Sequence, residues 1–186
     1  MGGAMDNSVP IDDHELRILR DRARALAVAP VTAPVDGDLI NALRFKLGDE
    51  TYAIEYRHIR EVLPLPRVTP LPCVPLFVRG IINIRGRIVS LLDLRSILGM
   101  QDAPRGPTSS AIILQSTTVE FGLLADEILG LSAILLSSIQ TSLPTLTGVG
   151  AEYLRGITAE GLVLLDAGKL LADEKLVINE AVGEMA

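Results

Sequence analysis

Two arginines that could bind a carboxylate lie at the tip of an apolar stretch, residues 79–93. Arg85 and Arg87 flank Gly86 there, within a run of Ile, Val and Leu residues. A guanidinium is planar and can grip a carboxylate through two parallel hydrogen bonds while its stem stays dry. Glu61 is a candidate partner for either arginine. Their spacing alone supports two interpretations equally: the arginines bind a carboxylate, or they only keep the turn exposed to water.

Residues typical of catalysis or metal binding are sparse. The two histidines and the single cysteine, Cys73, have no metal-ligand spacing, and His58 has no motif that orients a carboxylate or nucleophile towards it. No glycine-rich phosphate loop, Gly-x-Ser-x-Gly elbow or His-Glu-x-x-His motif occurs. The sequence therefore predicts no catalytic residue, no metal and no cofactor, which favours a binding protein over an enzyme.

Asp93 and Asp166 occupy matching places, each just before a short apolar segment with helical spacing. As a carboxylate pair they would suit acid–base chemistry, but aspartate is also a preferred residue at the start of a helix. Their equivalent positions favour two helix N-caps. The first of these helices is expected to stop at Gly99.

Composition narrows the class of protein. The 186 residues are 48% hydrophobic with a net charge of −6, which supports a packed core and argues against nucleic-acid binding. No apolar run is long enough to cross a bilayer, and the N-terminus lacks a signal-peptide pattern. With a single cysteine and these features, a cytoplasmic protein without membrane insertion is expected.

Short apolar runs separated by turns predict β-hairpins over 43–54, 79–93, 111–124 and 155–165. Between the first two, Ile59, Val62 and Leu63 fall at i, i+3 and i+4, which predicts one or two exposed helical turns. The order of elements repeats, including an Arg-Gly pair at Arg79-Gly80 and Arg155-Gly156. A long unit used twice predicts two barrel-like halves, 41–100 and 108–172, within a domain over 39–182.

Residues 1–38 form an N-terminal extension of different character. A capping pattern at Asp12 and Glu15, followed by leucines on one stripe, predicts an amphipathic helix over 13–27. A Pro/Ala-rich linker follows it. The four arginines of the predicted helix are interpreted as its solvent-exposed face.

The stretch from Phe77 to Arg95, with Asn83-Ile84-Arg85-Gly86 at its tip and Asp93-Leu94-Arg95 at its exit, resembles the signature of the CheW-like chemotaxis coupling proteins. Similar segments follow in the same order from 41 to about 175. The resemblance implies a mostly β fold of two SH3-like five-stranded β-barrel subdomains with short helices. The N-terminal helix is extra to that pattern.

The resemblance also implies a non-enzymatic scaffold that couples chemoreceptors to the regulatory domain of the histidine kinase CheA, and possibly to other CheW-like proteins. Such a protein would be membrane-associated only through receptor arrays. The implied receptor-binding residues are Tyr56, Ile59, Glu61, Val62, Arg85 and Ile128, with Asn83, Gly86, Asp93 and Asp166 as structural motif residues. The kinase-binding surface matches no motif.

Two other interpretations stay open. A small-ligand-binding β-module would show a deep pocket instead of a shallow apolar groove. A CheW-like adaptor could also serve an output other than swimming, such as pilus motility.

Overall fold

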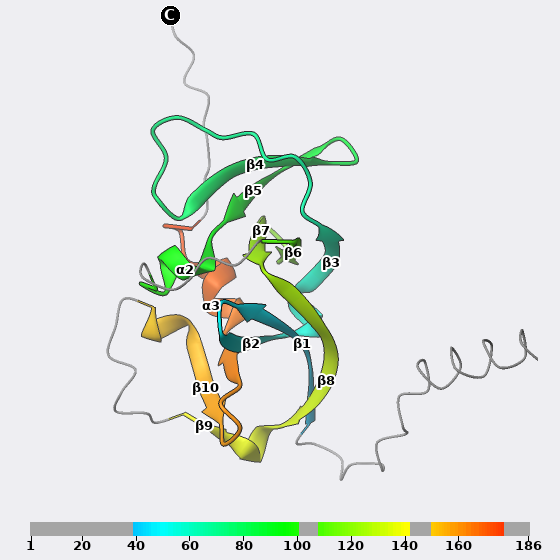
Figure 1. Ribbon diagram of the computed structural model, residues 1–186, viewed down its shortest axis with the longest axis vertical. Coiled ribbons are helices and arrows are strands. Elements are labelled where there is room, and N and C mark those ends of the chain that lie inside the picture. Colours follow the sequence, from blue (N-terminus) through cyan, green and yellow to red (C-terminus); the bar gives the residue numbers. More distant parts are fainter. Residues whose placement is uncertain (1–38, 101–107, 142–149, 177–186) are drawn as a thin grey trace, which may run out of the picture. The chain divides into compact units, whose positions relative to one another are not determined.

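The computed structural model describes residues 39–100, 108–141 and 150–176, which form two β-sheets joined by a common core (Figure 1). The mostly β fold predicted from the sequence is confirmed. The expected helix over 13–27, the linker after it and the end of the 39–182 domain lie outside the described residues.

Sheet A has six strands in the order β8-β1-β2-β11-β10-β9, all antiparallel neighbours except the parallel pair β2 and β11. The sixth strand, β9, has two residues, so the sheet exceeds the predicted five strands by this one short element. Its strands are β1 (Leu39–Leu47), β2 (Glu50–Glu55), β8 (Glu127–Leu135), β9 (Ile139–Gln140), β10 (Leu154–Thr158) and β11 (Val163–Leu165).

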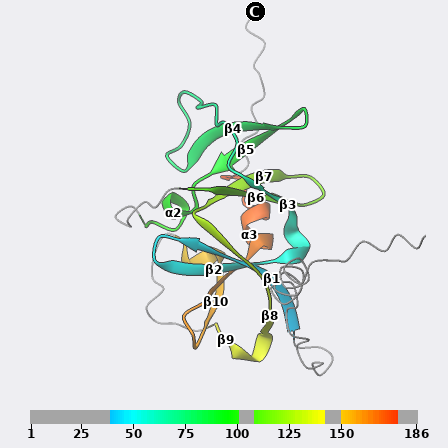
Figure 2. The ribbon, with the colours of Figure 1, turned by 45° about the vertical axis from the view of Figure 1, so that its right-hand side comes forward.

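Sheet B has the predicted five strands, in the order β3-β6-β7-β5-β4, with a parallel pair at β5 and β7. Helix α3 lies between the two sheets in both views (Figures 1 and 2). The strands are β3 (Ile59–Pro64), β4 (Val78–Ile84), β5 (Arg87–Leu92), β6 (Ser110–Gln115) and β7 (Glu120–Ala125). The helices are α2 (Leu94–Ile97), α3 (Ala167–Ala172) and the 3₁₀ turns η1 (Tyr56–His58), η2 (Leu136–Ser138) and η3 (Ala151–Tyr153).

The two sheets do not coincide with the stretches 41–100 and 108–172, so the prediction that each stretch forms its own barrel needs correction. The first hairpin of the chain, β1 and β2, pairs with strands β8 and β11 of the second stretch. The hairpin of β6 and β7 pairs with β3 and β5 of the first stretch. The two stretches repeat the same order of elements, but the first hairpin of each stretch pairs with strands of the other. Strand pairing over long separations leaves no mark in local periodicity.

The predicted helical turns at 59–63 are wrong, because these residues form strand β3. The strand pairs antiparallel with β6 and carries a register shift between Ile59 and Glu61. A β-bulge inserts one residue and breaks the period of two. The bulge therefore gives the apolar residues of this strand a spacing of three and four, which is the spacing expected of a helix.

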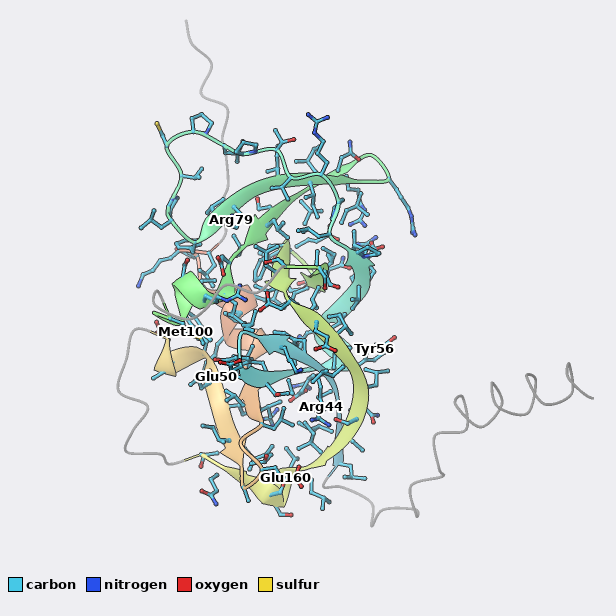
Figure 3. The ribbon with its side chains drawn as sticks, in the orientation of Figure 1. Arg44, Glu50, Tyr56, Arg79, Met100 and Glu160 are labelled. Atoms are coloured by element: carbon cyan, nitrogen blue, oxygen red, sulfur yellow. The ribbon has the colours of Figure 1, made fainter. Side chains whose placement is uncertain are left out.

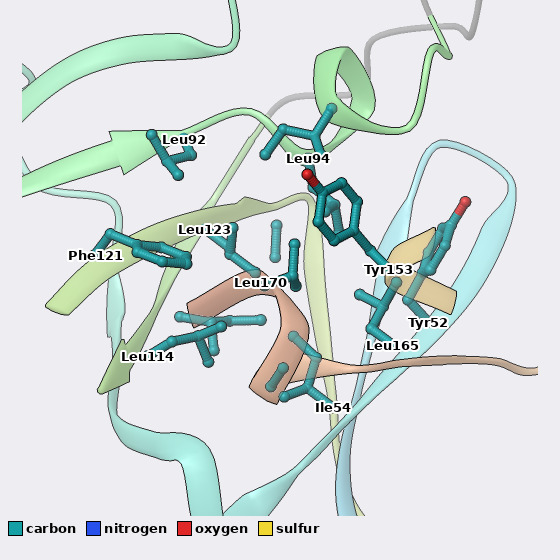
Figure 4. Close-up of a cluster of buried hydrophobic side chains, with 14 of the residues drawn as sticks. Tyr52, Ile54, Leu92, Leu94, Leu114, Phe121, Leu123, Tyr153, Leu165 and Leu170 are labelled. Carbon is teal, nitrogen blue, oxygen red and sulfur yellow. The ribbon is translucent and has the colours of Figure 1, made fainter. Parts of the chain in front are cut away.

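The strands around the shared core are buried on both faces, which explains their unbroken apolar sequences. On β6, Ile112 and Leu114 join the core between the sheets, whereas Ala111 and Ile113 join a smaller cluster within sheet B. On β2, Ile54 faces the shared core and Ala53 faces a third cluster within sheet A. The shared core also takes side chains from β5, β7, α2, η3, β11 and α3, among them those labelled in Figure 4: Leu92, Leu94, Phe121, Leu123, Tyr153, Leu165 and Leu170.

The repeated Arg-Gly pairs mark the same bulge in both sheets. Register shifts fall between Val78 and Gly80 in β4 and between Leu154 and Gly156 in β10. A Cβ atom added to Gly80 would lie 2.2 Å from the carbonyl oxygen of Thr69, and one added to Gly156 would lie 2.6 Å from that of Gln140. Glycine is required at both places because a neighbouring backbone passes too close for any side chain.

The capping interpretation of the two aspartates is confirmed. The Asp93 side chain accepts a hydrogen bond from the backbone N–H of Arg95 at the start of α2. The Asp166 side chain accepts one from Lys169 at the start of α3. In each case the aspartate's own N–H donates to a carbonyl upstream, that of Phe77 and that of Tyr153. The two residues therefore fix equivalent strand-to-helix corners.

Candidate partner-binding surface

The hairpin tip is a two-residue turn in which Arg85 and Gly86 both have positive φ, 51° and 88°. Strand pairing up to Ile84 and Arg87 leaves these two residues as the loop. The Asn83 side-chain oxygen accepts a hydrogen bond of 2.8 Å from the Gly86 N–H. Asn83 and Gly86 thus build the turn itself. Arg85 holds a left-handed position that asparagine or glycine would occupy at lower cost.

Glu61 on β3 faces the arginines of this hairpin, as its charge suggested. Its closer partner is Arg87, whose Nη2 lies 2.8 Å from Glu61 Oε1. Arg85 Nη2 lies 4.0 Å from Glu61 Oε2, and the Arg85 side chain is 86% exposed. The structure therefore divides the two roles: Arg87 pairs within the protein, and Arg85 projects into solvent.

Sequence reasoning missed two further members of this charged group. Arg87 also donates to Glu120 at the start of β7. Arg60 Nε lies 3.5 Å from the same carboxylate, and its Nη1 donates to Gln115 on β6 at 2.9 Å. The hydrogen bond to Glu120 and the charges of both carboxylates raise the pKa of Arg87 above its ordinary value. No motif marks Glu120 or Arg60, since only the pairing of β3, β6 and β7 brings them together.

The apolar candidates divide into exposed and structural residues. Tyr56 on η1 is 54% exposed and Val62 on β3 is 39% exposed, and Figure 3 shows Tyr56 at the outer side of the molecule beside β1. Ile59 and Ile128 are half-buried and pack against the shared core. Tyr56 and Val62 therefore offer apolar surface for a partner, whereas Ile59 and Ile128 contribute mainly to packing.

A second apolar stripe follows strand β8, at the edge of sheet A. Leu129, Leu131 and Leu135 alternate with inward-facing residues and are 40%, 60% and 50% exposed. An alternating apolar face left open at a sheet edge is a typical protein-binding surface. Only Ile128 of this strand was singled out from the sequence, and it faces inwards.

A buried ion pair supports sheet A where it meets helix α2. Arg95 donates to Asp126, whose Oδ2 also accepts a hydrogen bond of 2.7 Å from the Gly48 N–H in the β1–β2 turn. Both side chains are nearly enclosed. The pair ties the first hairpin of the chain to the corner capped by Asp93.

Neither a metal centre nor a membrane span is found in the part of the chain that the structure describes. No group of three His, Cys, Asp or Glu side chains there is placed to hold a metal ion. No described helix is long and apolar enough to cross a bilayer.

Comparison with known proteins identifies the family. The model of the CheW-like domain matches residues 41–175. The chain is 28% identical to the chemotaxis protein CheW of Treponema pallidum over 153 residues, which covers 78% of this chain and 90% of that protein. It is 32% identical to the protein FrzA of Myxococcus xanthus, covering 68% of this chain and 82% of FrzA.

Solved structures agree. The scaffolding protein TtCheW from Thermoanaerobacter tengcongensis matches with a TM-score of 0.60 at 26% identity, over 68% of this chain and 88% of that one. Taken with the two-sheet fold and the Asn83 hairpin, these matches show that the chain belongs to the CheW-like domain family of chemotaxis-type adaptor proteins.

Proposed function

We propose that this protein is a non-enzymatic adaptor that couples chemoreceptor cytoplasmic tips to the regulatory domain of the histidine kinase CheA. The observation that carries the proposal is a set of exposed side chains: Tyr56 on η1, Val62 on β3, and Arg85 at the tip of the hairpin whose Arg87 pairs with Glu61. These elements expose both apolar and charged groups. An apolar patch with a charged rim fits a protein partner better than a small substrate.

Arg85 supports this proposal because it occupies a backbone position that disfavours it. A non-glycine residue in the left-handed region costs of order 1–2 kcal/mol and is retained where it does something else. The Arg85 side chain is exposed, and its one described carboxylate partner is already bound at shorter distance by Arg87. We assign Arg85 to a carboxylate on the receptor tip.

The proposed receptor site is thus Tyr56, Val62, Glu61 and Arg85. Ile59 and Ile128 shape it from beneath through their contacts with the shared core. The adaptor is expected to bind CheA, and other CheW-like proteins, through different surfaces, and to reach the membrane only within receptor arrays. Residues 39–182 are assigned as the adaptor domain.

Direct binding to a receptor-tip fragment and to the CheA regulatory domain tests the proposal. Tyr56→Ala and Val62→Asp are better probes than Ile59→Asp, because the first two side chains are exposed and Ile59 helps to pack the core. We expect each of the two to weaken receptor binding about tenfold or more while CheA binding stays within about twofold. Thr118→Asp, on the exposed β6–β7 turn, is the matched surface control. Wild-type receptor affinity in both variants would contradict the site.

A further inference from the structure

A hollow of about 330 Å³ lies within sheet A, on the side away from the shared core. Ile134 and Leu162, which line it, belong to the buried cluster that contains Ala42 and Ala53. Arg44 on β1 lies directly opposite Ala53 and extends into the same region. Figure 3 shows Arg44 inside the arc of β8, above Glu160. Its lining includes Arg44, Ser132, Ala133, Ile134, Glu160 and Leu162.

Two polar atoms in this lining are buried and find no hydrogen-bond partner within the part of the chain that the structure describes. They are Arg44 Nε and Ser132 Oγ, both shielded from solvent. Among the described residues no carboxylate forms an ion pair with Arg44. A buried polar group without a partner is destabilising, and a charged one is more so. An arginine kept in such a place is explained if a ligand supplies the missing acceptor.

The residues that line the hollow indicate the chemical class of that ligand. One guanidinium N–H and one hydroxyl match the two oxygens of a carboxylate. Ala133, Ile134 and Leu162 provide apolar surface for a short alkyl chain. Glu160, which also lines the hollow, disfavours an ion with two negative charges such as phosphate.

A neighbouring hollow of about 420 Å³ shares Arg44, Glu160 and Leu162 but adds Asp49 and Glu50 to its lining. Three carboxylates make that side unsuitable for an anion. The geometry therefore points to the smaller hollow, and we propose that it binds a small aliphatic monocarboxylate through Arg44 and Ser132. This role goes beyond the adaptor function and is independent of it.

Titration of the full-length protein with sodium butyrate tests the proposal, with sodium chloride at equal ionic strength as the reference. A ligand that binds only the folded state raises the melting temperature with concentration. We expect butyrate to raise it and to shift the Arg44 Nε–Hε signal in ¹H–¹⁵N NMR spectra of the wild type. Arg44→Met should weaken butyrate binding at least tenfold, and Ser132→Ala should weaken it several-fold. Arg79→Met, on the exposed β4 surface, should leave it unchanged.

The outcomes are distinguishable. No effect of butyrate beyond that of chloride on the wild type overturns the proposal, as does an equal effect in Arg44→Met. Stabilisation by inorganic phosphate but not by butyrate overturns the assignment to a carboxylate. If Arg44→Met does not fold, the wild-type NMR titration and the Ser132→Ala variant decide the question. Receptor and CheA binding, measured without butyrate, report separately on the adaptor role.

Discussion

Glu61 and Arg87 form an ion pair of 2.8 Å although their strands, β3 and β5, are separated by two others in sheet B. Strands with two others between them in a flat sheet lie too far apart for such a contact. The pair therefore forms because the sheet curls, and it joins the edge strand β3 to the hairpin that carries Arg85. Arg87 in turn donates to Glu120 on β7, so one guanidinium contacts carboxylates from two strands.

Arg87 is expected to matter more for stability than Arg85. Arg87→Met leaves Glu61 and Glu120 without their shared partner and should lower the free energy of unfolding measurably. Arg85→Met should change it by less than about 0.5 kcal/mol. Urea denaturation of both variants, and of each combined with Glu61→Gln, measures the difference. A larger loss in Arg85→Met would contradict the division of roles.

Replacement of Arg85 by glycine should separate stability from binding. The left-handed turn position suits glycine, so Arg85→Gly is expected to stabilise the protein or leave it unchanged, by up to about 1 kcal/mol. Receptor affinity should nevertheless fall about tenfold, because the partner carboxylate loses its guanidinium. Thermal denaturation and a binding titration of the same preparation measure both effects. Wild-type receptor affinity in Arg85→Gly would show that Arg85 is not part of the receptor-binding site.

Gly80→Ala should be severely destabilising, by more than about 3 kcal/mol, because the new Cβ meets the Thr69 backbone. Gly130→Ala is the matched control: its φ of 103° is also positive, but no atom lies within 4 Å of the added Cβ. The control should cost only about 1–2 kcal/mol. Denaturation of both variants compares the two, and equal losses would show that backbone strain, not close approach, requires the glycine.

Tyr153→Phe should reduce stability in a pH-dependent way. The Tyr153 hydroxyl and the Lys175 backbone N–H donate to Asp173 and lower the pKa of its carboxyl below the ordinary 3.8. A lowered pKa contributes stability that is complete above 3.8 and is lost as the pH falls through the folded value. Because Asp173 is partly exposed to solvent, we expect a difference below about 1 kcal/mol between wild type and variant near neutral pH. That difference should shrink towards pH 3, and one that stays constant would exclude this origin.

The sequence predicts the elements of this fold better than their pairing. Short apolar runs bounded by turn residues mark each hairpin, and Asp93 and Asp166 indicate their helices through local capping. Strand β3 is the exception, since the bulge near Arg60 gives Ile59, Val62 and Leu63 a helical spacing. The exchange of hairpins between the sheets depends on contacts across the whole chain, which no local pattern encodes.

The candidate site shows the same division. The charge of Glu61 and the hairpin tip predict that they meet, but the choice of Arg87 as the closer partner depends on the curl of sheet B. Arg44 is equally hidden in the sequence: it stands between Leu43 and Phe45 in an alternating strand and there resembles a solvent-facing residue. The fold places it in a hollow with residues of β8 and of the turn between β10 and β11, which are distant in the sequence.

Capture of the CheA regulatory domain on an immobilised receptor-tip fragment tests the central claim most directly. The account predicts that CheA is retained only when this protein is added. It also predicts that Arg85→Glu abolishes the retention while direct binding of the variant to CheA persists, with Arg79→Glu as the exposed-arginine control that behaves as wild type. Failure of the wild-type protein to retain CheA, with both partners folded, would contradict the adaptor function.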